Sequence, residues 1–347
     1  MDDLTISSQR LGAMLRTAMG DVLTAALQDP EVFEIMVNPD GTLRVDRAGQ
    51  GRIDTGVFIL PVDAERIIRL VASHIRVEVD ATRPIVSAEL PPLADGTGGE
   101  RFEGLLPPVV GAPCFSIRKP AYRLFTLDDY AKAGVMTKDQ AHSLKRAVWD
   151  RNNVLVAGGT SSGKTTLTNA LLAAIAETGE RVILIEDTRE LRCVAPDVVA
   201  LRTKPGVATM TDLVRSTLRL RPDRIVVGEV RGGEALDMLK AWNTGHPGGV
   251  ATLHANSARG ALIRLEQLVQ EVVANVPRAL IAEAIDIVVF IHGENAATGA
   301  PRRIGEIAEV WGLDAAGAYD LRPLSTGNFA AGSTLSTSTH CTGESHA

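Results

Sequence analysis

Residues 158–165 read Gly-Gly-Thr-Ser-Ser-Gly-Lys-Thr, and this string restricts the fold of the chain more than any other segment. It fits the pattern G-x-x-x-x-G-K-[ST] completely. The apolar segment Val154 to Val156 precedes it, and Thr166 to Ala176 follows it as a good helix. A glycine-rich turn between a strand and a helix exposes backbone N–H groups beside the positive end of the helix. The string and its flanks therefore predict a Walker A phosphate-binding loop.

The loop residues have distinct expected roles. Lys164 would reach the β- and γ-phosphates of ATP, and the Thr165 hydroxyl would coordinate Mg²⁺. The residues expected to bind the nucleotide are Gly158, Gly159, Thr160, Ser161, Ser162, Gly163, Lys164, Thr165 and Thr166.

Alternating apolar strands and helices follow from Asn153 onward. The expected strands are Val154–Val156, Val182–Ile185, Val198–Leu201, Ile225–Val227 and Val250–Leu253. This alternation is typical of an α/β fold, in which helices cover both faces of a parallel sheet.

Several of these strands end in carboxylates or a histidine. The strand Ile225–Val227 leads into Glu229, which we expect to position water or hold the metal ion. Glu186 and Asp187 end another strand, and Glu190 lies just beyond it. Because the carboxyl ends of parallel strands meet at one edge, these side chains should lie together and suit Mg²⁺. His254 ends a further strand and His246 precedes it. Either could sense the γ-phosphate, although a structural hydrogen-bonding role is the simpler interpretation.

The first 120 residues indicate a small α+β domain. A helix is expected at 4–28, with an apolar face formed by Leu11, Met14, Leu15, Ala18, Val22 and Ala25 that packs against its own domain. Short strands at 34–37 and 43–45, a helix at 62–75 and further strands from 83 to 117 follow. The expected organisation is an N-terminal domain at 1–120, a linker at 121–135, an ATPase domain at 136–324 and a disordered tail at 325–347. A capping box at Thr137–Gln140 should start a helix that ends near residue 150.

Composition excludes several other classes. The net charge of −6 and the absence of Lys/Arg runs argue against stable binding of nucleic acid. Three widely spaced cysteines form neither a zinc knuckle nor a disulfide framework and favour a reducing cytoplasm. Apolar runs stay below the roughly 18 residues that a membrane-spanning helix needs, and the acidic start of the chain does not suit a signal peptide.

Four boxes in this order resemble the secretion-superfamily ATPases of type II and type IV secretion, conjugation and pilus dynamics. They are the Walker A loop, an aspartate box at 185–191, a Walker B segment at 225–229 and a histidine box at 245–254. Segments at 100–104, 117–120 and 240–245 are most similar to the conjugal-transfer branch. Ser161 stands where glycine is common in the family, a departure that we expect the cradle to tolerate.

The resemblance implies a RecA-like P-loop NTPase motor domain with a smaller N-terminal α+β domain that is sensor-like (PAS-like). It further implies ATP and Mg²⁺ as cofactors, a homo-hexameric ring, and a cytoplasmic location at the inner membrane with membrane components of the apparatus as partners. By the same resemblance Arg101 and Arg118 lie at the nucleotide, and Glu229, Lys164, Glu186 and His254 complete the catalytic set. Thr165, Asp187 and Glu229 would be the residues at the metal.

Other interpretations stay open from the sequence. A pilus-retraction ATPase shares the four boxes, and a type II secretion ATPase usually carries a four-cysteine zinc insert that this chain cannot build. A nucleic-acid translocase would use the same fold but a more basic surface. A nucleotide-dependent scaffold without turnover would not need Glu229. A transporter ATPase of the ABC type would need an LSGGQ-like signature, which the chain lacks.

Overall fold

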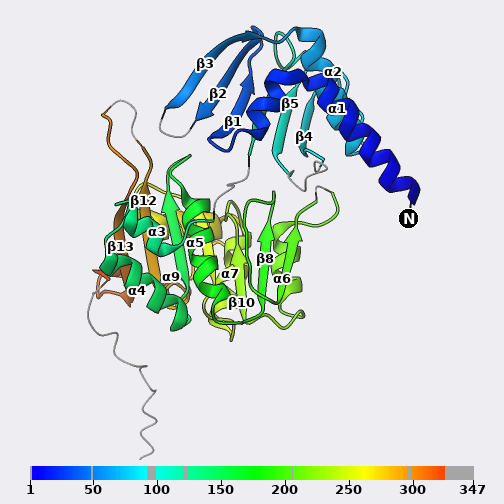
Figure 1. Ribbon diagram of the computed structural model, residues 1–347. Coiled ribbons are helices and arrows are strands. Elements are labelled where there is room, and N and C mark those ends of the chain that lie inside the picture. The colour runs from blue at the N-terminus through cyan, green and yellow to red at the C-terminus, as the bar shows by residue number, and fades with distance from the viewer. Residues whose placement is uncertain are drawn as a thin grey trace, which may run out of the picture.

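The computed structural model describes residues 2–47, 50–91, 99–119, 124–204, 206–294 and 298–324, with side chains described from residue 12 onward. Two separate sheets organise these residues. The N-terminal sheet has the strand order β3-β2-β1-β6-β5-β4, and the larger sheet has the order β14-β13-β12-β7-β11-β10-β8-β9. The N-terminal sheet and its helices stand on one end of the larger α/β unit (Figure 1).

The N-terminal sheet is antiparallel throughout its pairings. Its strands are β1 (Val32–Val37), β2 (Thr42–Arg47), β3 (Gly51–Phe58), β4 (Ile85–Glu89), β5 (Arg101–Leu105) and β6 (Cys114–Arg118). Helices α1 (Asp2–Gln28) and α2 (Pro61–His74) pack on one face and share one apolar core with the strands. The expected helices and the strands at 34–37 and 43–45 are confirmed, whereas β3 was not predicted.

Helix α1 buries only part of the face predicted for it: Leu15 is buried and Ala18 is half-buried, as expected, but other residues complete the buried face. The buried side chains of its described part are Leu15, Met19, Leu23 and Leu27, whereas Met14, Val22 and Ala25 are exposed. Gly20 has φ 67° and ψ −177°, so the helix is kinked there. The buried positions keep a four-residue spacing across the kink, and the predicted face was partly wrong because it included apolar residues that stay exposed, Met14 and Val22. The helix does pack against its own domain, as expected.

The larger unit carries the strands that the sequence predicted, and a parallel sheet forms its centre. The parallel strands are β7 (Val154–Gly158), β8 (Val182–Glu186), β9 (Val198–Arg202), β10 (Arg224–Val227), β11 (Val250–His254) and β12 (Ile287–His292). Strands β13 (Arg303–Leu313) and β14 (Tyr319–Pro323) extend it with antiparallel pairing. The sheet is thus mixed, and β12 to β14 were not predicted.

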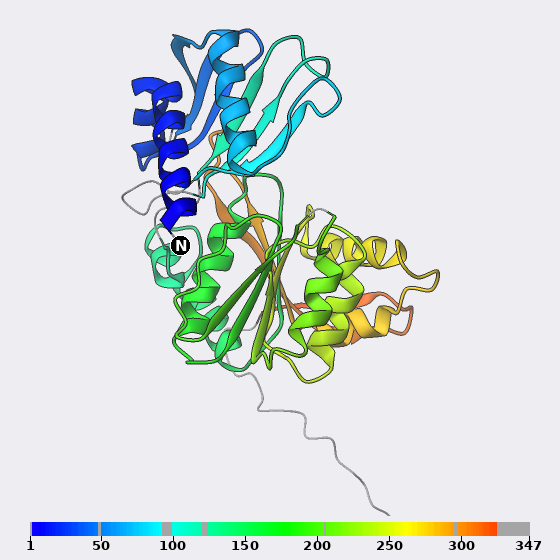
Figure 2. The same cartoon turned by 90° about the vertical axis from the view of Figure 1, so that its right-hand side faces the viewer.

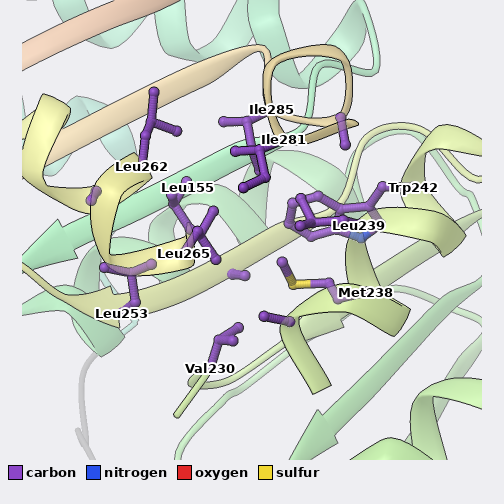
Figure 3. Packing of buried hydrophobic residues seen from close by; sticks show 14 of the residues in the cluster. Leu155, Val230, Met238, Leu239, Trp242, Leu253, Leu262, Leu265, Ile281 and Ile285 are labelled. Carbon is purple, nitrogen blue, oxygen red and sulfur yellow. The ribbon is translucent and has the colours of Figure 1, made fainter. Parts of the chain in front are cut away.

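Helices cover both faces of this sheet, which confirms the expected layering; Figure 2 shows them on either side of the strands. The helices are α3 (Leu127–Lys132), α4 (Lys138–Trp149), α5 (Lys164–Ala176), α6 (Met210–Thr217), α7 (Glu234–Asn243), α8 (Ala258–Gln270) and α9 (Arg278–Ala284). Alternate residues of β7 point to opposite cores. Leu155 lies beside Leu265 in a cluster that also contains Trp242 (Figure 3), and Val156 belongs to the core that includes residues of α4 and α5 on the other face.

Two local features refine the expected boundaries. Helix α4 begins at the predicted capping box. The Thr137 hydroxyl accepts a hydrogen bond from the Gln140 backbone amide, and the Gln140 side chain accepts one from the Thr137 backbone amide. Helix α3 lies inside the stretch expected to be linker, and its own capping box between Thr126 and Asp129 explains why it forms. The tail at 325–347, expected to be disordered, lies outside the described residues.

Candidate active site

The Walker A loop joins β7 to α5 at the carboxyl edge of the parallel sheet. A Cβ atom on Gly158 would lie 2.5 Å from the Ser162 hydroxyl, so only glycine fits there. Gly163 caps α5 with φ 98°. Ser161 has φ 58°, in the left-handed region. A residue other than glycine costs about 1 kcal/mol or more in that conformation, which gives a physical reason for the glycine that is common at this position.

The loop leaves backbone donors unpaired. In the described part of the chain, the amides of Gly163, Lys164 and Thr165 donate to no acceptor. They stand at the N-terminus of α5, where the helix dipole adds partial positive charge. The loop therefore has the donors and the electrostatic field that a phosphate group requires.

Lys164 is a buried cation in contact with the loop carbonyls. Its Nζ donates to the Gly159 carbonyl at 2.9 Å and to the Gly158 carbonyl at 3.2 Å, and it lies 3.3 Å from His254 Nδ1. Burial lowers the pKa of Lys164, and the charge of Glu229 opposes that shift. The Lys164 amine and the Glu229 carboxylate thus interact electrostatically across the site.

Glu229 follows β10 at the same edge, as predicted. Its Oε1 lies 2.9 Å from His254 Nε2, and its Oε2 accepts a hydrogen bond of 2.8 Å from Arg231 Nε. Burial lowers the pKa of His254, and the positive charge of Lys164 lowers it further. Both effects favour the neutral imidazole, the charge of Glu229 opposes them, and the ring stands between Lys164 and Glu229.

The other two residues expected at the metal, Asp187 and Thr165, contact different partners. Asp187 accepts a hydrogen bond of 2.8 Å from the Thr203 hydroxyl and lies 3.7 Å from Arg231, which links it to Glu229. The Thr165 hydroxyl donates to Glu190 at 3.1 Å. Among the described residues, no group of three or more His, Cys, Asp or Glu side chains is arranged to hold a metal ion.

Glu186 points inward. Its carboxylate accepts the amides of Glu190 at 2.9 Å and Leu191 at 2.8 Å, and thereby shapes the aspartate-box loop. The side chain is buried, and this burial raises its pKa to about 7. These contacts give Glu186 a role in holding Glu190 toward Thr165.

His246 lies at the far edge of the sheet. It precedes β11, whereas His254 ends it, and its Nδ1 lies 3.1 Å from the Pro222 carbonyl. Because β7 and β11 are parallel, His246 is a strand length away from the Walker A loop. The histidine box thus contributes His254 to the site, whereas His246 has the structural contact that the simpler interpretation expected.

Three charged residues of the N-terminal sheet face the larger unit. Arg101 and Arg118 are directly opposed on β5 and β6, and Glu89 is opposite Arg101 on β4. Glu89 reaches across to Arg202 of β9 at 2.6 Å. The charge of Arg118 lowers the pKa of Lys164 and of His254, after burial and other neighbours. Arg118 is therefore within electrostatic reach of the loop. For Arg101, the described residues show no such effect or contact at the loop.

A comparison with known families identifies the chain. Residues 59–292 match the family model described as type II/IV secretion system protein. This chain belongs to that family. It is 48% identical to the conjugal transfer protein TrbB of Rhizobium radiobacter over 308 residues, which cover 88% of this chain and 92% of the relative. It is also 35% identical to the type IV secretion system protein PtlH of Bordetella pertussis, over 81% of this chain and 91% of that protein.

The pilus retraction motor PilT, solved with bound ADP, has a similar fold with a TM-score of 0.58. The match covers 78% of this chain and 76% of PilT at 18% identity, so it supports the fold alone. The secretion-family resemblance read from the four boxes is therefore confirmed. None of the described helices is long and apolar enough to cross a membrane.

Two residues that the structure brings to the site, Arg231 and Glu89, had no role in the sequence analysis, and Glu190 was expected only as one of several carboxylates at this edge. Glu190 accepts a hydrogen bond from the Thr165 hydroxyl, and Arg231 joins Glu229 to Asp187. Glu89 forms an ion pair with Arg202 and also accepts a hydrogen bond of 3.4 Å from the Arg189 amide. Glu190 and Arg231 lie inside or next to the boxes, so box membership was an available signal. Glu89 could not be found in this way, because only the packing of the two sheets against each other brings it there.

Proposed function

We propose that this protein is a cytoplasmic ATP hydrolase that powers a type IV secretion or conjugal-transfer apparatus. The observation that carries the proposal is the Walker A loop, with unpaired amides at Gly163 to Thr165, beside the Lys164–His254–Glu229 contact. The 48% identity to a conjugal transfer protein supports the transport role. This similarity favours conjugal transfer over pilus retraction or type II secretion.

The residues present fit ATP and Mg²⁺. Unpaired amides of the loop and Lys164 would hold the phosphates. Thr165 would hold Mg²⁺ together with a carboxylate of the strand-end edge, Asp187 or Glu229, because Mg²⁺ prefers oxygen ligands and keeps several waters. When bound, Mg²⁺ neutralises phosphate charge. A small set of protein oxygens is sufficient for such a site, since the nucleotide itself supplies oxygens.

Each side chain of the site would then have a separate role. Lys164 would leave the Gly158 and Gly159 carbonyls for phosphate oxygens. Glu229 would orient the attacking water, and His254 stands beside its carboxylate, with 2.9 Å between Nε2 and Oε1. Glu186 acts by fixing the aspartate-box loop. Arg118, with Arg101 beside it, would add positive charge from the N-terminal sheet. Hydrolysis would therefore depend on the position of that sheet relative to the Walker A loop.

A steady-state ATPase assay tests the enzyme. We expect wild-type protein with Mg²⁺ to turn ATP over and Lys164→Ala to retain less than about a tenth of that rate, a loss of more than about 1.4 kcal/mol in transition-state binding. A thermal melt on the same samples shows whether the variant is folded. An active Lys164→Ala protein, or an inactive wild type in every oligomeric form, would contradict the proposal.

We further propose a homo-hexameric RecA-like ring that docks on inner-membrane components, with the N-terminal PAS-like domain as its sensor. Electron microscopy with a non-hydrolysable ATP analogue tests the ring. A closed six-membered ring is the expected image, and a persistent monomer would argue against a motor. Turnover unchanged by single- and double-stranded DNA is also expected, because the net charge is −6. Strong stimulation would favour a nucleic-acid translocase.

A further inference from the structure

The side of the Walker A loop away from Glu229 carries a second cation. In the strand order, β11 and β10 lie on one side of β7, and β12 and β13 lie on the other. Arg302 immediately precedes β13. An added Cβ on Gly163 would lie 3.0 Å from Arg302 Nε and 3.1 Å from its Cδ. The Arg302 side chain therefore lies directly against the loop.

The guanidinium has little to bind in the described part of the chain. Arg302 Nε is buried and has no hydrogen-bond partner, and Nη2 has one long contact, 3.5 Å to the Ser161 carbonyl. No described carboxylate forms an ion pair with it. A buried donor without a partner costs about 1–3 kcal/mol. A group that completes its hydrogen bonds would recover that free energy.

A second unsatisfied group lies near Arg302. The Tyr130 hydroxyl of α3 is buried and also lacks a hydrogen-bond partner. Burial raises the pKa of this phenol, and the nearby charge of Arg302 opposes the shift. The backbone after β12 is equally close to the loop, since a Cβ on Gly293 would lie 3.1 Å from Ser162 Cα. This side of the loop is thus closely packed yet has polar groups that lack partners.

We infer that Arg302 binds the nucleotide at its α-phosphate and ribose end. This inference rests on the proposed function, because it assumes that the loop binds a nucleotide. With the terminal phosphate directed toward Glu229 and His254, the nucleoside end of an extended molecule falls toward β12 and β13. A guanidinium contacts phosphate oxygens through several donors at once, and its planar face stacks on other planar groups.

The chemistry gives Arg302 a different role from Arg118. ATP and ADP share their α-phosphate and ribose, so Arg302 would bind both equally and stabilise ground and transition states alike. Loss of such uniform binding raises KM and leaves kcat unchanged. A cation that acts on the γ-phosphate would instead change kcat. Arg302 is therefore a nucleotide-binding residue and is not assigned to the chemical step.

Direct titration tests this inference. We would measure the Kd of ADP and of a non-hydrolysable ATP analogue by calorimetry for wild type, Arg302→Ala, Arg302→Lys and the control Arg303→Ala. Arg303 is the next residue and is exposed, and within the described residues no side-chain hydrogen bond or ion pair joins it to the loop. We expect Arg302→Ala to weaken both nucleotides by the same factor, about tenfold, which is about 1.4 kcal/mol. Arg302→Lys should recover part of the loss, and Arg303→Ala should match wild type.

The steady-state arm should show a raised KM for ATP in Arg302→Ala with kcat within about twofold of wild type. Unchanged nucleotide affinity in Arg302→Ala would overturn the inference, and so would a loss of affinity for the ATP analogue alone. In either case, nucleotide binding by the wild type would still support the proposed function. A fall in kcat at constant Kd would overturn it as well. If Arg302→Ala melts early, Arg302→Gln replaces it, because it keeps a planar polar group and removes the charge. Wild-type protein that binds neither nucleotide would contradict the proposed function itself.

Discussion

Arg101 and Arg118 are directly opposed on the antiparallel strands β5 and β6. Side chains at opposed positions share one face of the sheet, and like charges there are destabilising. Neither arginine forms a side-chain hydrogen bond or ion pair within the described residues. Of the neighbours in the same row, Glu89 pairs with Arg202 and Glu34 accepts the Ser116 hydroxyl. Two adjacent arginines that lack a side-chain partner in the described part of the chain are the arrangement expected where an anion binds.

The arginines should matter for turnover more than for folding. We expect Arg118→Ala to lower kcat by about 10² or more, because a guanidinium that acts on the γ-phosphate stabilises developing charge. Arg101→Ala should have a similar effect if both arginines hold the same anion. The affinity for ADP and the melting temperature should change little. Steady-state kinetics, ADP titration and a thermal melt measure these quantities.

The control is Arg52→Ala, an exposed arginine of the edge strand β3 in the same domain. Mixing the Arg118→Ala protein with Lys164→Ala protein tests whether the contact is made between subunits. Recovered activity in the mixture would indicate a contact in trans. Full activity of both single arginine variants would remove these residues from the mechanism.

Glu229→Gln should separate binding from hydrolysis. The amide keeps the size of the side chain and its place beside His254 and Arg231, but it cannot accept a proton or orient water as a carboxylate does. We expect turnover below about 1% of wild type with Mg-ATP affinity within a few-fold. A matched control is Glu306→Gln, an exposed carboxylate on β13. Loss of nucleotide binding in a folded Glu229→Gln protein would instead make Glu229 mainly a metal ligand.

Gly249 in the histidine box should be required for stability. A Cβ there would lie 2.2 Å from ring atoms of Trp242, which is buried and donates to the Ile225 carbonyl at 3.1 Å. Gly249→Ala must therefore displace the indole, at a cost of about 1–3 kcal/mol. Gly111→Ala is the control, because nothing lies within 4 Å of its added Cβ. Urea unfolding measures both, and equal stabilities would contradict the packing described.

The central strands could be predicted from the sequence because their signal is local. Val182 to Ile185 is an apolar run with a polar end, and burial on both faces of a parallel sheet produces that pattern. The Walker A loop is similarly local, since its eight residues and its two flanks determine the turn. Glu229 followed from its strand end alone, because parallel strands bring those ends to one edge. The strand end placed His254 at the same edge, but only the family resemblance gave it a catalytic role.

The remaining contacts depend on long-range packing. The position of Arg118 near Lys164 requires both the register of β6 and the placement of one sheet on the other. The Arg302 contact requires β12 to pair with β7, and neither β12 nor β13 was predicted. His246 and His254 look equivalent in the sequence, but a strand that runs between them places them at opposite edges. The Gly20 kink in α1 likewise depends on a backbone conformation that periodicity does not encode.

Glu186 should make stability depend on pH. Its folded-state pKa is raised from 4.5 to about 7 because the carboxyl group is buried. Below pH 4.5 both folded and unfolded states are protonated, and the contribution to stability is fully present. Between pH 4.5 and 7 the unfolded state loses its proton first, so stability falls as pH rises and then levels off. The full loss corresponds to at most about 3 kcal/mol.

Glu186→Gln should remove this loss, because the amide oxygen still accepts the amides of Glu190 and Leu191 without carrying charge. We expect wild type and variant to have similar free energies of unfolding near pH 5 and the variant to be the more stable by pH 8. Urea unfolding without nucleotide at pH 5, 6, 7 and 8 measures the difference, and Glu306→Gln should follow the wild-type profile. A difference that stays constant across this range would mean that Glu186 ionises as freely in the folded protein as in the unfolded chain. In that case the buried carboxylate must be stabilised by its two loop amides strongly enough to offset burial, and Glu186 would remain available as a charged group beside Glu190 and Thr165.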